Sequence, residues 1–300
     1  MGKTYDKEEM GDTDRDLSRA QTFDPAQIDA IDHADTTGFN GGRMAATVLL
    51  IRDGENGLEV WVQERVSTMV NYPGYVVFPG GGVDSRDFPP RSWDSGEFWA
   101  GNSVVSMARR MGVTKYKAHA LVFAAARELF EEAGTLLVVD DNGPIKDSSP
   151  FHDQRMLLET HEVSFTDFLA ENSMKVNSDL LIPWARWVGS SGAKNWFDTF
   201  FFVALLPQGQ QPDGETGEAA DANWFPPRLL LDGWKAGLVR LVVPTWAQLQ
   251  RLAQYDSVAE VIDAASLSDT RPVIGDPEDD PRYHDFFTTT PIDRISWRSH

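Results

Sequence analysis

The chain contains no cysteine among its 300 residues. This absence excludes disulfide bonds, cysteine-ligated zinc, iron–sulfur clusters and thiol nucleophiles, so any catalytic metal must be bound through oxygen or imidazole. The sequence also has no run of about 18 uncharged apolar residues, and its first residues lack the apolar segment of a secretory signal. We therefore expect a cytoplasmic protein without a membrane partner.

Basic residues are scarce. The 27 Lys and Arg residues face 46 Asp and Glu residues, which gives a formal net charge of -19. Such a charge opposes the counterion release that drives binding to long nucleic acids, so no nucleic-acid partner is predicted. A small anionic substrate is still compatible with this charge, because divalent cations bound by carboxylates reverse the local potential.

The composition, 41% hydrophobic and 11% aromatic, predicts one sizeable core with extensions. We predict a flexible acidic leader over residues 1–38, a catalytic domain over 39–255 and a C-terminal extension over 256–300. No regular fold is expected after Leu267. Within the domain, the polar residues 85–116 are interpreted as an inserted segment.

Hydrophobic periodicity predicts a β-hairpin from two strands near the start of the domain, then a third short strand that stops at Gly80. A helix is expected to run to Ala133 and to end at Gly134 in the left-handed conformation. The predicted strands cover residues 44–51, 58–63, 75–78, 200–206 and 222–225, and the predicted helices cover 118–133, 228–236 and 245–254.

Three glutamates share one face of the helix at 118–133. At about 100° per residue, Glu128, Glu131 and Glu132 project within one arc, opposite an apolar stripe. Like charges at this spacing repel each other, so a positive partner is expected. Hard divalent cations prefer oxygen ligands, which favours magnesium. The alternative is a solvated acidic helix face, which is the commoner use of such residues.

A glycine-rich turn precedes this helix. The run Phe78-Pro79-Gly80-Gly81-Gly82-Val83-Asp84 is typical of loops whose backbone N–H groups approach an anion closely. Either feature alone is weak evidence. The turn followed by the acidic helix is much stronger evidence for a site that binds a phosphate group.

In this order the two features resemble the signature of the Nudix hydrolases, G-x5-E-x7-R-E-U-x-E-E-x-G-U, where U is aliphatic. The second half matches over Arg127–Gly134, and Thr135 takes the last aliphatic position. In the first half, Asp87 replaces the family's Glu. Gly81 and Arg127 lie 46 residues apart instead of the family's 14, which leaves 32 extra residues.

An interruption at this place resembles the branch of the family that contains the peroxisomal coenzyme A diphosphatases of mammals and their bacterial relatives. Further stretches are similar to that branch: Arg65, Tyr72–Gly81, Trp184–Trp187 and Phe197–Phe201. One departure is Val70, which stands where the coenzyme A signature of other Nudix enzymes has a second arginine.

The resemblance implies an α+β fold, the α/β/α Nudix sandwich, in which a mixed β-sheet lies between helices, with a helical insertion and a C-terminal helical extension. It implies that Mg²⁺, which Mn²⁺ can replace, is bound by Glu128, Glu131 and Glu132. Arg127 would brace a glutamate, and a general base or further ligand is expected at Glu218, with Glu215 as second choice. The implied substrate-binding residues are Arg65, Gly80 and Gly81.

The expected activity is metal-dependent hydrolysis of a pyrophosphate bond in a small nucleotide-linked substrate. The first choice is coenzyme A or acyl-coenzyme A, which would give 3',5'-ADP and (acyl-)4'-phosphopantetheine; the alternative is NADH or ADP-ribose. A hypothesis of another class is a non-catalytic Nudix-fold module that senses a ligand or binds a partner. The aromatic-rich insertion is compatible with a homodimer. His119 is interpreted as a packing residue, and Asp198 as a buried cap of a loop.

Overall fold

A long strand, β1 (Arg43–Gly54), lies at the centre of the main sheet. The computed structural model describes residues 34–55, 57–68, 72–90, 96–189, 196–217 and 219–289. The predicted hairpin is confirmed, because β1 pairs antiparallel with β2 (Gly57–Arg65). On its other side β1 pairs in parallel with β10 (Phe197–Leu205). The main sheet is therefore mixed, as predicted.

The main sheet has the order β11-β2-β1-β10-β9-β12, with β3 paired to β2 and β4 paired to β1. A second sheet has the order β5-β8-β6-β7. The remaining strands are β3 (Val76–Val77), β4 (Gly80–Gly82), β5 (Trp99–Ala100), β6 (Val138–Asp140), β7 (Gly143–Pro144), β8 (Lys175–Asn177), β9 (Ile182–Val188), β11 (Ala219–Phe225) and β12 (Pro272–Ile274).

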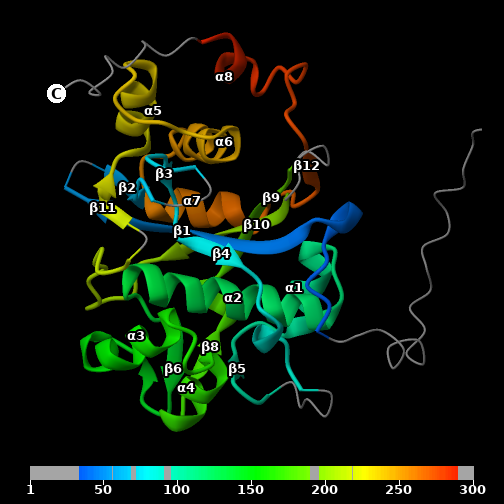
Figure 1. Ribbon diagram of the computed structural model, residues 1–300, viewed down its shortest axis with the longest axis vertical. Helices are drawn as coiled ribbons and strands as arrows, with labels where there is room; N and C mark the ends of the chain where they lie inside the picture. The colour runs from blue at the N-terminus through cyan, green and yellow to red at the C-terminus, as the bar shows by residue number, and fades with distance from the viewer. Residues whose placement is uncertain are drawn as a thin grey trace, which may run out of the picture. The chain divides into compact units, whose positions relative to one another are not determined.

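Helices cover both faces of the main sheet (Figure 1). Helices α1, α2, α3 and α4 lie with the second sheet on one face, and α5, α6 and α7 lie on the other. Their bounds are α1 (Val104–Met111), α2 (Lys115–Ala133), α3 (His152–Glu159), α4 (Phe165–Glu171), α5 (Pro227–Lys235), α6 (Val243–Leu252), α7 (Val258–Ser266) and α8 (His284–Thr288). Short 3-10 helices are η2 (Phe39–Gly41), η3 (Ser85–Asp87), η4 (Ser149–Phe151) and η5 (Ser178–Leu180).

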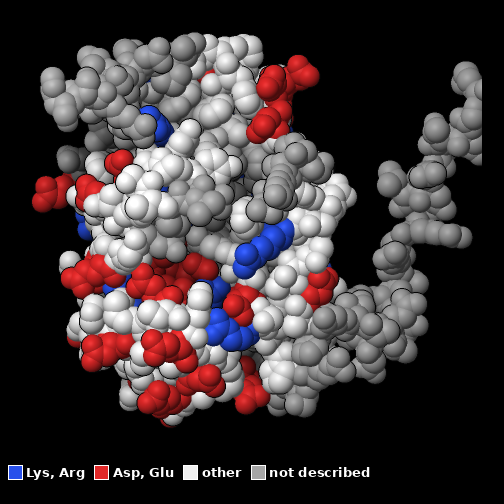
Figure 2. All heavy atoms as spheres, viewed as in Figure 1, with Lys and Arg blue, Asp and Glu red and all other residues white. Residues whose placement is uncertain are grey.

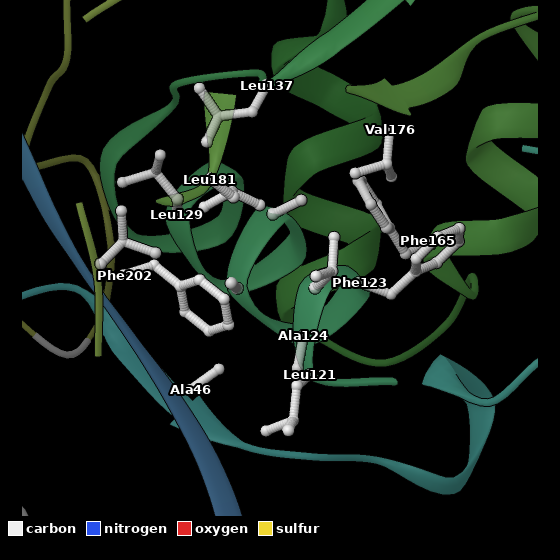
Figure 3. Close-up of a cluster of buried hydrophobic side chains, with 14 of the residues drawn as sticks. Ala46, Leu121, Phe123, Ala124, Leu129, Leu137, Phe165, Val176, Leu181 and Phe202 are labelled. Carbon is white, nitrogen blue, oxygen red and sulfur yellow. The ribbon is translucent and has the colours of Figure 1, made fainter. Parts of the chain in front are cut away.

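Alternation along the central strands builds a separate core on each face. In β10, Phe200 and Phe202 point to the side of α2, whereas Phe201 and Val203 point to the side of α5–α7, because successive side chains of a strand face opposite ways. Figure 3 shows the first core, which contains Phe202 of β10, the α2 side chains Leu121 and Ala124, and Val176 of the second sheet. The first core therefore places α2 between the main sheet and the second sheet.

The chain ends differ in part from the sequence-based expectations. Residues 1–33 of the predicted leader lie outside the described residues, but residues 34–38 are held in place: Asp35 pairs with Lys117 at 2.9 Å, and Thr37 bridges to Arg43. The expectation of no regular structure after Leu267 was wrong. Strand β12 joins the main sheet in parallel with β9, and Phe286 of α8 stacks on Trp234.

None of the helices in the described part of the chain is long and apolar enough to cross a bilayer.

Candidate active site

The acidic helix α2 is buried on nearly all sides. It begins after Thr114, whose side chain accepts a hydrogen bond from Lys117 N, and it ends at Gly134, which has φ of 62° as predicted. The sequence placed the three glutamates on one arc opposite an apolar stripe, with a solvated acidic face as the alternative. Glu131 and Glu132 are only 6% and 5% exposed, which speaks against that alternative. Strand β4, η3 and helix α3 pack against α2.

The glycine turn lies directly against this helix. Gly80 to Gly82 form the short strand β4, which pairs with β1, although the sequence predicted that regular structure ends there. A Cβ on Gly81 would lie 2.5 Å from Oε1 of Glu128, and a Cβ on Gly80, at φ of 155°, would overlap the carbonyl oxygen of Ala46. Only glycine permits this close approach of the turn to both β1 and α2.

Glu132 is held by donors from the main sheet. Its Oε2 accepts a hydrogen bond of 2.6 Å from Nε2 of Gln63 and one of 3.0 Å from the backbone N–H of Gly80. Gln63 is itself almost fully buried. The glycine turn and strand β2 therefore fix the carboxylate of Glu132 from one side.

Arg127 braces the other two glutamates. Its Nη1 donates to Oε1 of Glu128 at 2.8 Å and to Oε2 of Glu131 at 3.1 Å. The same guanidinium forms two hydrogen bonds of 3.0 Å with the two carboxylate oxygens of Asp87. Burial alone would lower the pKa of Arg127, but these carboxylates outweigh burial and raise it, so the guanidinium remains charged. The single positive charge of Arg127 is thus paired with three carboxylates, those of Asp87, Glu128 and Glu131.

Asp87, which the sequence resemblance aligns with a signature glutamate, is 2% exposed and is held by its own turn. Its Oδ2 accepts the backbone N–H of Asp84 at 2.8 Å, in a capping box around η3. Nδ1 of His119 donates to the carbonyl of Asp87 at 2.9 Å, and the His119 ring stacks on Phe123. Burial lowers the pKa of His119 to about 3, so its ring is neutral, in agreement with a packing role.

Asp198 is fully buried and acts at a loop, as the sequence suggested. Its carboxylate accepts the backbone N–H of Phe39 at 2.7 Å and two hydrogen bonds from Arg186.

A cavity of about 230 Å³ opens over the carboxylates. Of the predicted site residues, it brings together Gly81, Arg127, Glu128, Glu131 and Glu132. The other lining residues are Arg43, Gly82, Asp84, Glu159, His161 and Thr216. Figure 2 shows acidic side chains gathered in a band at the level that α2 occupies in Figure 1. The cavity is therefore strongly acidic.

Other predicted residues lie elsewhere. Gly80 acts through its N–H on Glu132 and does not line the cavity. Arg65 ends β2 opposite Ala219 and does not line it either. Glu218 lies outside the described residues. Glu215 lies in the loop before β11, where its carbonyl accepts from Arg155.

Sequence reasoning missed Arg43, Glu159 and His161 as lining residues. No motif marks them, because they come from the start of β1 and from the end of α3 and the turn that follows. Asp84 carried a weak signal, since it belongs to the Gly-Val-Asp-x-x-Asp stretch after the glycine turn.

The carboxylate oxygens of this site are suitable ligands for a divalent cation, but the described side chains are not arranged around a single ion position. Within the described ranges, no group of three acidic or histidine side chains is arranged to hold a metal ion. Arg127 instead binds oxygens of Glu128 and Glu131, and Gln63 and Gly80 bind Oε2 of Glu132. However, Oε1 of Glu131 is buried and accepts no hydrogen bond from a described residue. Burial raises the pKa of Glu131 to about 7 against the opposing effect of Arg127. A buried oxygen without a donor, beside surplus carboxylates, suits a hard cation.

No family model matches the chain. It is 25% identical over 234 residues to the acyl-coenzyme A diphosphatase NUDT19 of Xenopus laevis, covering 68% of this chain and 62% of that protein. It is 27% identical over 212 residues to the putative nudix hydrolase 7 of Caenorhabditis elegans, covering 71% of this chain and 61% of that protein. The chain thus spans about three fifths of the length of these relatives.

Among solved structures, the chain is similar to a NUDIX hydrolase from Alicyclobacillus acidocaldarius, with 28% sequence identity and a TM-score of 0.61. The match covers 78% of this chain and all of that one. The fold is that of the Nudix hydrolases, and the glycine turn lies against the acidic helix as the signature predicted. In sequence and in fold the chain is similar to Nudix hydrolases.

Proposed function

We propose that this protein hydrolyses the diphosphate bond of a nucleotide-linked metabolite, with coenzyme A or an acyl-coenzyme A as first substrate. One observation carries the proposal: Glu128, Glu131 and Glu132 line one acidic cavity together with the glycine turn. The name of the Xenopus relative, an acyl-coenzyme A diphosphatase, supports the choice of substrate. Water would be consumed, one P–O–P bond would break, and the products would be 3',5'-ADP and (acyl-)4'-phosphopantetheine.

Glu128, Glu131 and Glu132 would hold Mg²⁺, or Mn²⁺ in its place. When bound, such a cation lowers the pKa of coordinated water and neutralises charge on phosphate oxygens. The protein's own part is to hold the three carboxylates in place. Arg127 fixes Glu128 and Glu131, and the Gly80 N–H with Gln63 fixes Glu132.

Arg43 is proposed as the residue that contacts substrate phosphate. It is exposed, lines the cavity, and its guanidinium would lie 3.0 Å from a Cβ on Gly82, so the glycine leaves room for it. Arg127 is already engaged with three carboxylates. Arg43 is the better placed of the two to bind an incoming anion. Glu218 remains the proposed general base, and Arg65 remains a proposed substrate contact.

Product analysis tests the proposal. Purified protein with Mg²⁺, with Mn²⁺ or with chelator would be incubated with coenzyme A, acetyl-coenzyme A, NADH and ADP-ribose, and the products identified by mass. Metal-dependent release of 3',5'-ADP and 4'-phosphopantetheine supports coenzyme A as substrate. Cleavage of only NADH or ADP-ribose would correct the substrate, and no metal-dependent cleavage of any of the four would overturn the proposal. Reaction in ¹⁸O water would show which phosphorus is attacked.

A further inference from the structure

Helix α3, which no sequence pattern indicated, carries a fully buried arginine beside the active site. Arg155 is 1% exposed. Its guanidinium donates to the carbonyl of Glu131 at 3.0 Å, to Oδ1 of Asp213 at 2.7 Å and to the carbonyl of Glu215 at 3.2 Å. Arg155 therefore connects the backbone of the acidic helix α2 to the loop that precedes β11.

One turn further along α3, Glu159 contacts the same loop. Its Oε1 accepts hydrogen bonds from Oγ1 of Thr216 at 3.1 Å and from the backbone N–H of Gly217 at 2.9 Å. Residues four apart on a helix share a face. Arg155 and Glu159 thus hold residues 213–217, the clamped loop, from a single face of α3.

The clamped loop is also attached to the end of α2. The backbone N–H of Asp213 donates to the carbonyl of Ala133 at 3.2 Å. A Cβ on Gly134 would lie 2.7 Å from Nη1 of Arg155 and 2.9 Å from Oδ2 of Asp213. The glycine that ends the signature helix therefore also leaves room for the Arg155–Asp213 ion pair.

The surroundings of the Arg155–Asp213 ion pair indicate that it positions neighbouring backbone segments more than it stabilises the fold. Arg155 is buried, whereas the side chain of its partner Asp213 is 40% exposed. Burial of a guanidinium against a partly solvated partner returns little net stability. The arrangement does, however, fix three backbone segments relative to one another, and Thr216 and Glu159 line the cavity over the glutamates.

We propose that Arg155 and Glu159 are positioning residues, which hold the clamped loop as one wall of the acidic cavity and in register with the carboxylates of α2. The inference rests on the proposed hydrolase function for its effect on turnover. The clamped loop ends at Gly217, directly before Glu218 in the sequence. Loss of the clamp should therefore misplace this wall and the chain that leads to Glu218, without removing a metal ligand.

Two readouts test the clamp. The first is hydrogen–deuterium exchange of the clamped loop without substrate, in wild type, Glu159→Ala, Glu159→Gln and Arg155→Lys. The matched control is Asp153→Ala, an exposed acidic residue on the same helix. Exchange at Gly217 should accelerate in Glu159→Ala, which removes the acceptor, and return toward wild type in Glu159→Gln, which keeps an acceptor oxygen.

The second readout is turnover on whichever diphosphate substrate the protein cleaves. In Glu159→Ala and Arg155→Lys, kcat should fall by about ten- to a hundredfold, because small displacements at a reacting centre are costly. The affinity for Mn²⁺, measured by electron paramagnetic resonance, should be unchanged. Asp153→Ala should match wild type in both readouts, and Glu159→Gln should recover most of kcat.

Unchanged exchange of the clamped loop in Glu159→Ala and Arg155→Lys would overturn the clamp, whatever the activity. Faster exchange with unchanged kcat would overturn its role in positioning. If wild type cleaves no diphosphate, the proposed function fails, and the exchange data still decide whether the clamp exists. Should Arg155→Lys fail to fold, the Glu159 variants carry the test alone.

Discussion

Arg186 and Arg127 each bind buried carboxylates, and the two sites differ in charge balance. Among the described residues Arg186 pairs with one carboxylate, Asp198, through hydrogen bonds of 2.8 and 2.7 Å to its two oxygens, and Asp198 is fully buried. Arg127 faces Asp87, Glu128 and Glu131, and Glu132 lies one residue further along. At Arg186 one positive charge is balanced by one negative charge. The site at Arg127 has a surplus of negative charge beside a cavity.

The difference separates a structural ion pair from a site that can accept a cation. Asp198 also accepts the N–H of Phe39, so the pair between β9 and β10 fixes the chain that leads into β1. At Arg127, by contrast, one oxygen of Glu131 is buried and has no donor among the described residues. Leaving such an oxygen without a partner costs stability, and a bound divalent cation would remove that cost.

The largest expected effect comes from breaking the balanced pair. Asp198→Ala leaves the guanidinium of Arg186 buried without its counter-charge, so the free energy of unfolding should fall by about 3 to 5 kcal/mol. Denaturant unfolding would measure the change. The double variant Asp198→Leu with Arg186→Leu should recover much of the loss, because no charge remains unpaired. A loss below about 1 kcal/mol in the single variant would contradict a structural role for the pair.

At the site around Arg127, removal of a carboxylate should lower activity without lowering stability. Glu132→Gln removes one negative charge and keeps an acceptor for Gly80, so the melting temperature should stay the same or rise. Turnover should fall on the order of a hundredfold or more, if Glu132 holds a catalytic cation. Steady-state kinetics with Mg²⁺ and thermal melts with and without Mn²⁺ would measure both effects. Wild-type turnover in this variant would refute the assignment of Glu132.

His119 contacts Asp87 at the site with surplus negative charge, and its buried ring is neutral. Burial lowers its pKa from 6.5 to about 3, so the unfolded chain takes up a proton below pH 6.5 while the folded chain does not. Its contribution to stability is therefore complete above pH 6.5 and is lost as the pH falls toward 3. At pH 4.5 the loss should be roughly 2.5 kcal/mol.

The check is the pH dependence of unfolding in wild type and His119→Phe. The variant loses the hydrogen bond to Asp87 at every pH, but it should lack the component that titrates between pH 6.5 and 4.5. Parallel curves for the two proteins over this range would show that His119 is already protonated in the folded state.

The smallest expected effect concerns the exposed cation of the cavity. Arg43→Ala should raise KM by about tenfold and change kcat little, because it removes one charge-assisted contact to phosphate. Arg109→Ala, at an exposed arginine of α1 away from the cavity, is the matched control. Equal KM values in the two variants would exclude Arg43 as a phosphate contact. Comparison of coenzyme A with its 3'-dephospho form would show which phosphate is bound.

Local sequence patterns determined a large part of this molecule. The hairpin of β1 and β2 follows from strand alternation around a turn, and Gly134 ends α2 where a left-handed residue was expected. The spacing of Glu128, Glu131 and Glu132 puts them on one arc of a helix, and the glycine turn before them completes the Nudix signature. These features depend on residues close together in the chain, so periodicity and residue type suffice to find them.

Only the tertiary structure decided what surrounds those residues. Asp87 reaches Arg127 across 40 positions of sequence, and Arg155, Glu159 and Arg43 reach the cavity from α3 and the start of β1. The burial of Glu131 and Glu132 also depends on layers packed against α2 from distant segments. Local periodicity carries no information on these contacts, since they form only when separate elements pack together. The physical reason is that charge balance and burial are properties of the packed assembly, whereas helix faces and turns are properties of the local chain.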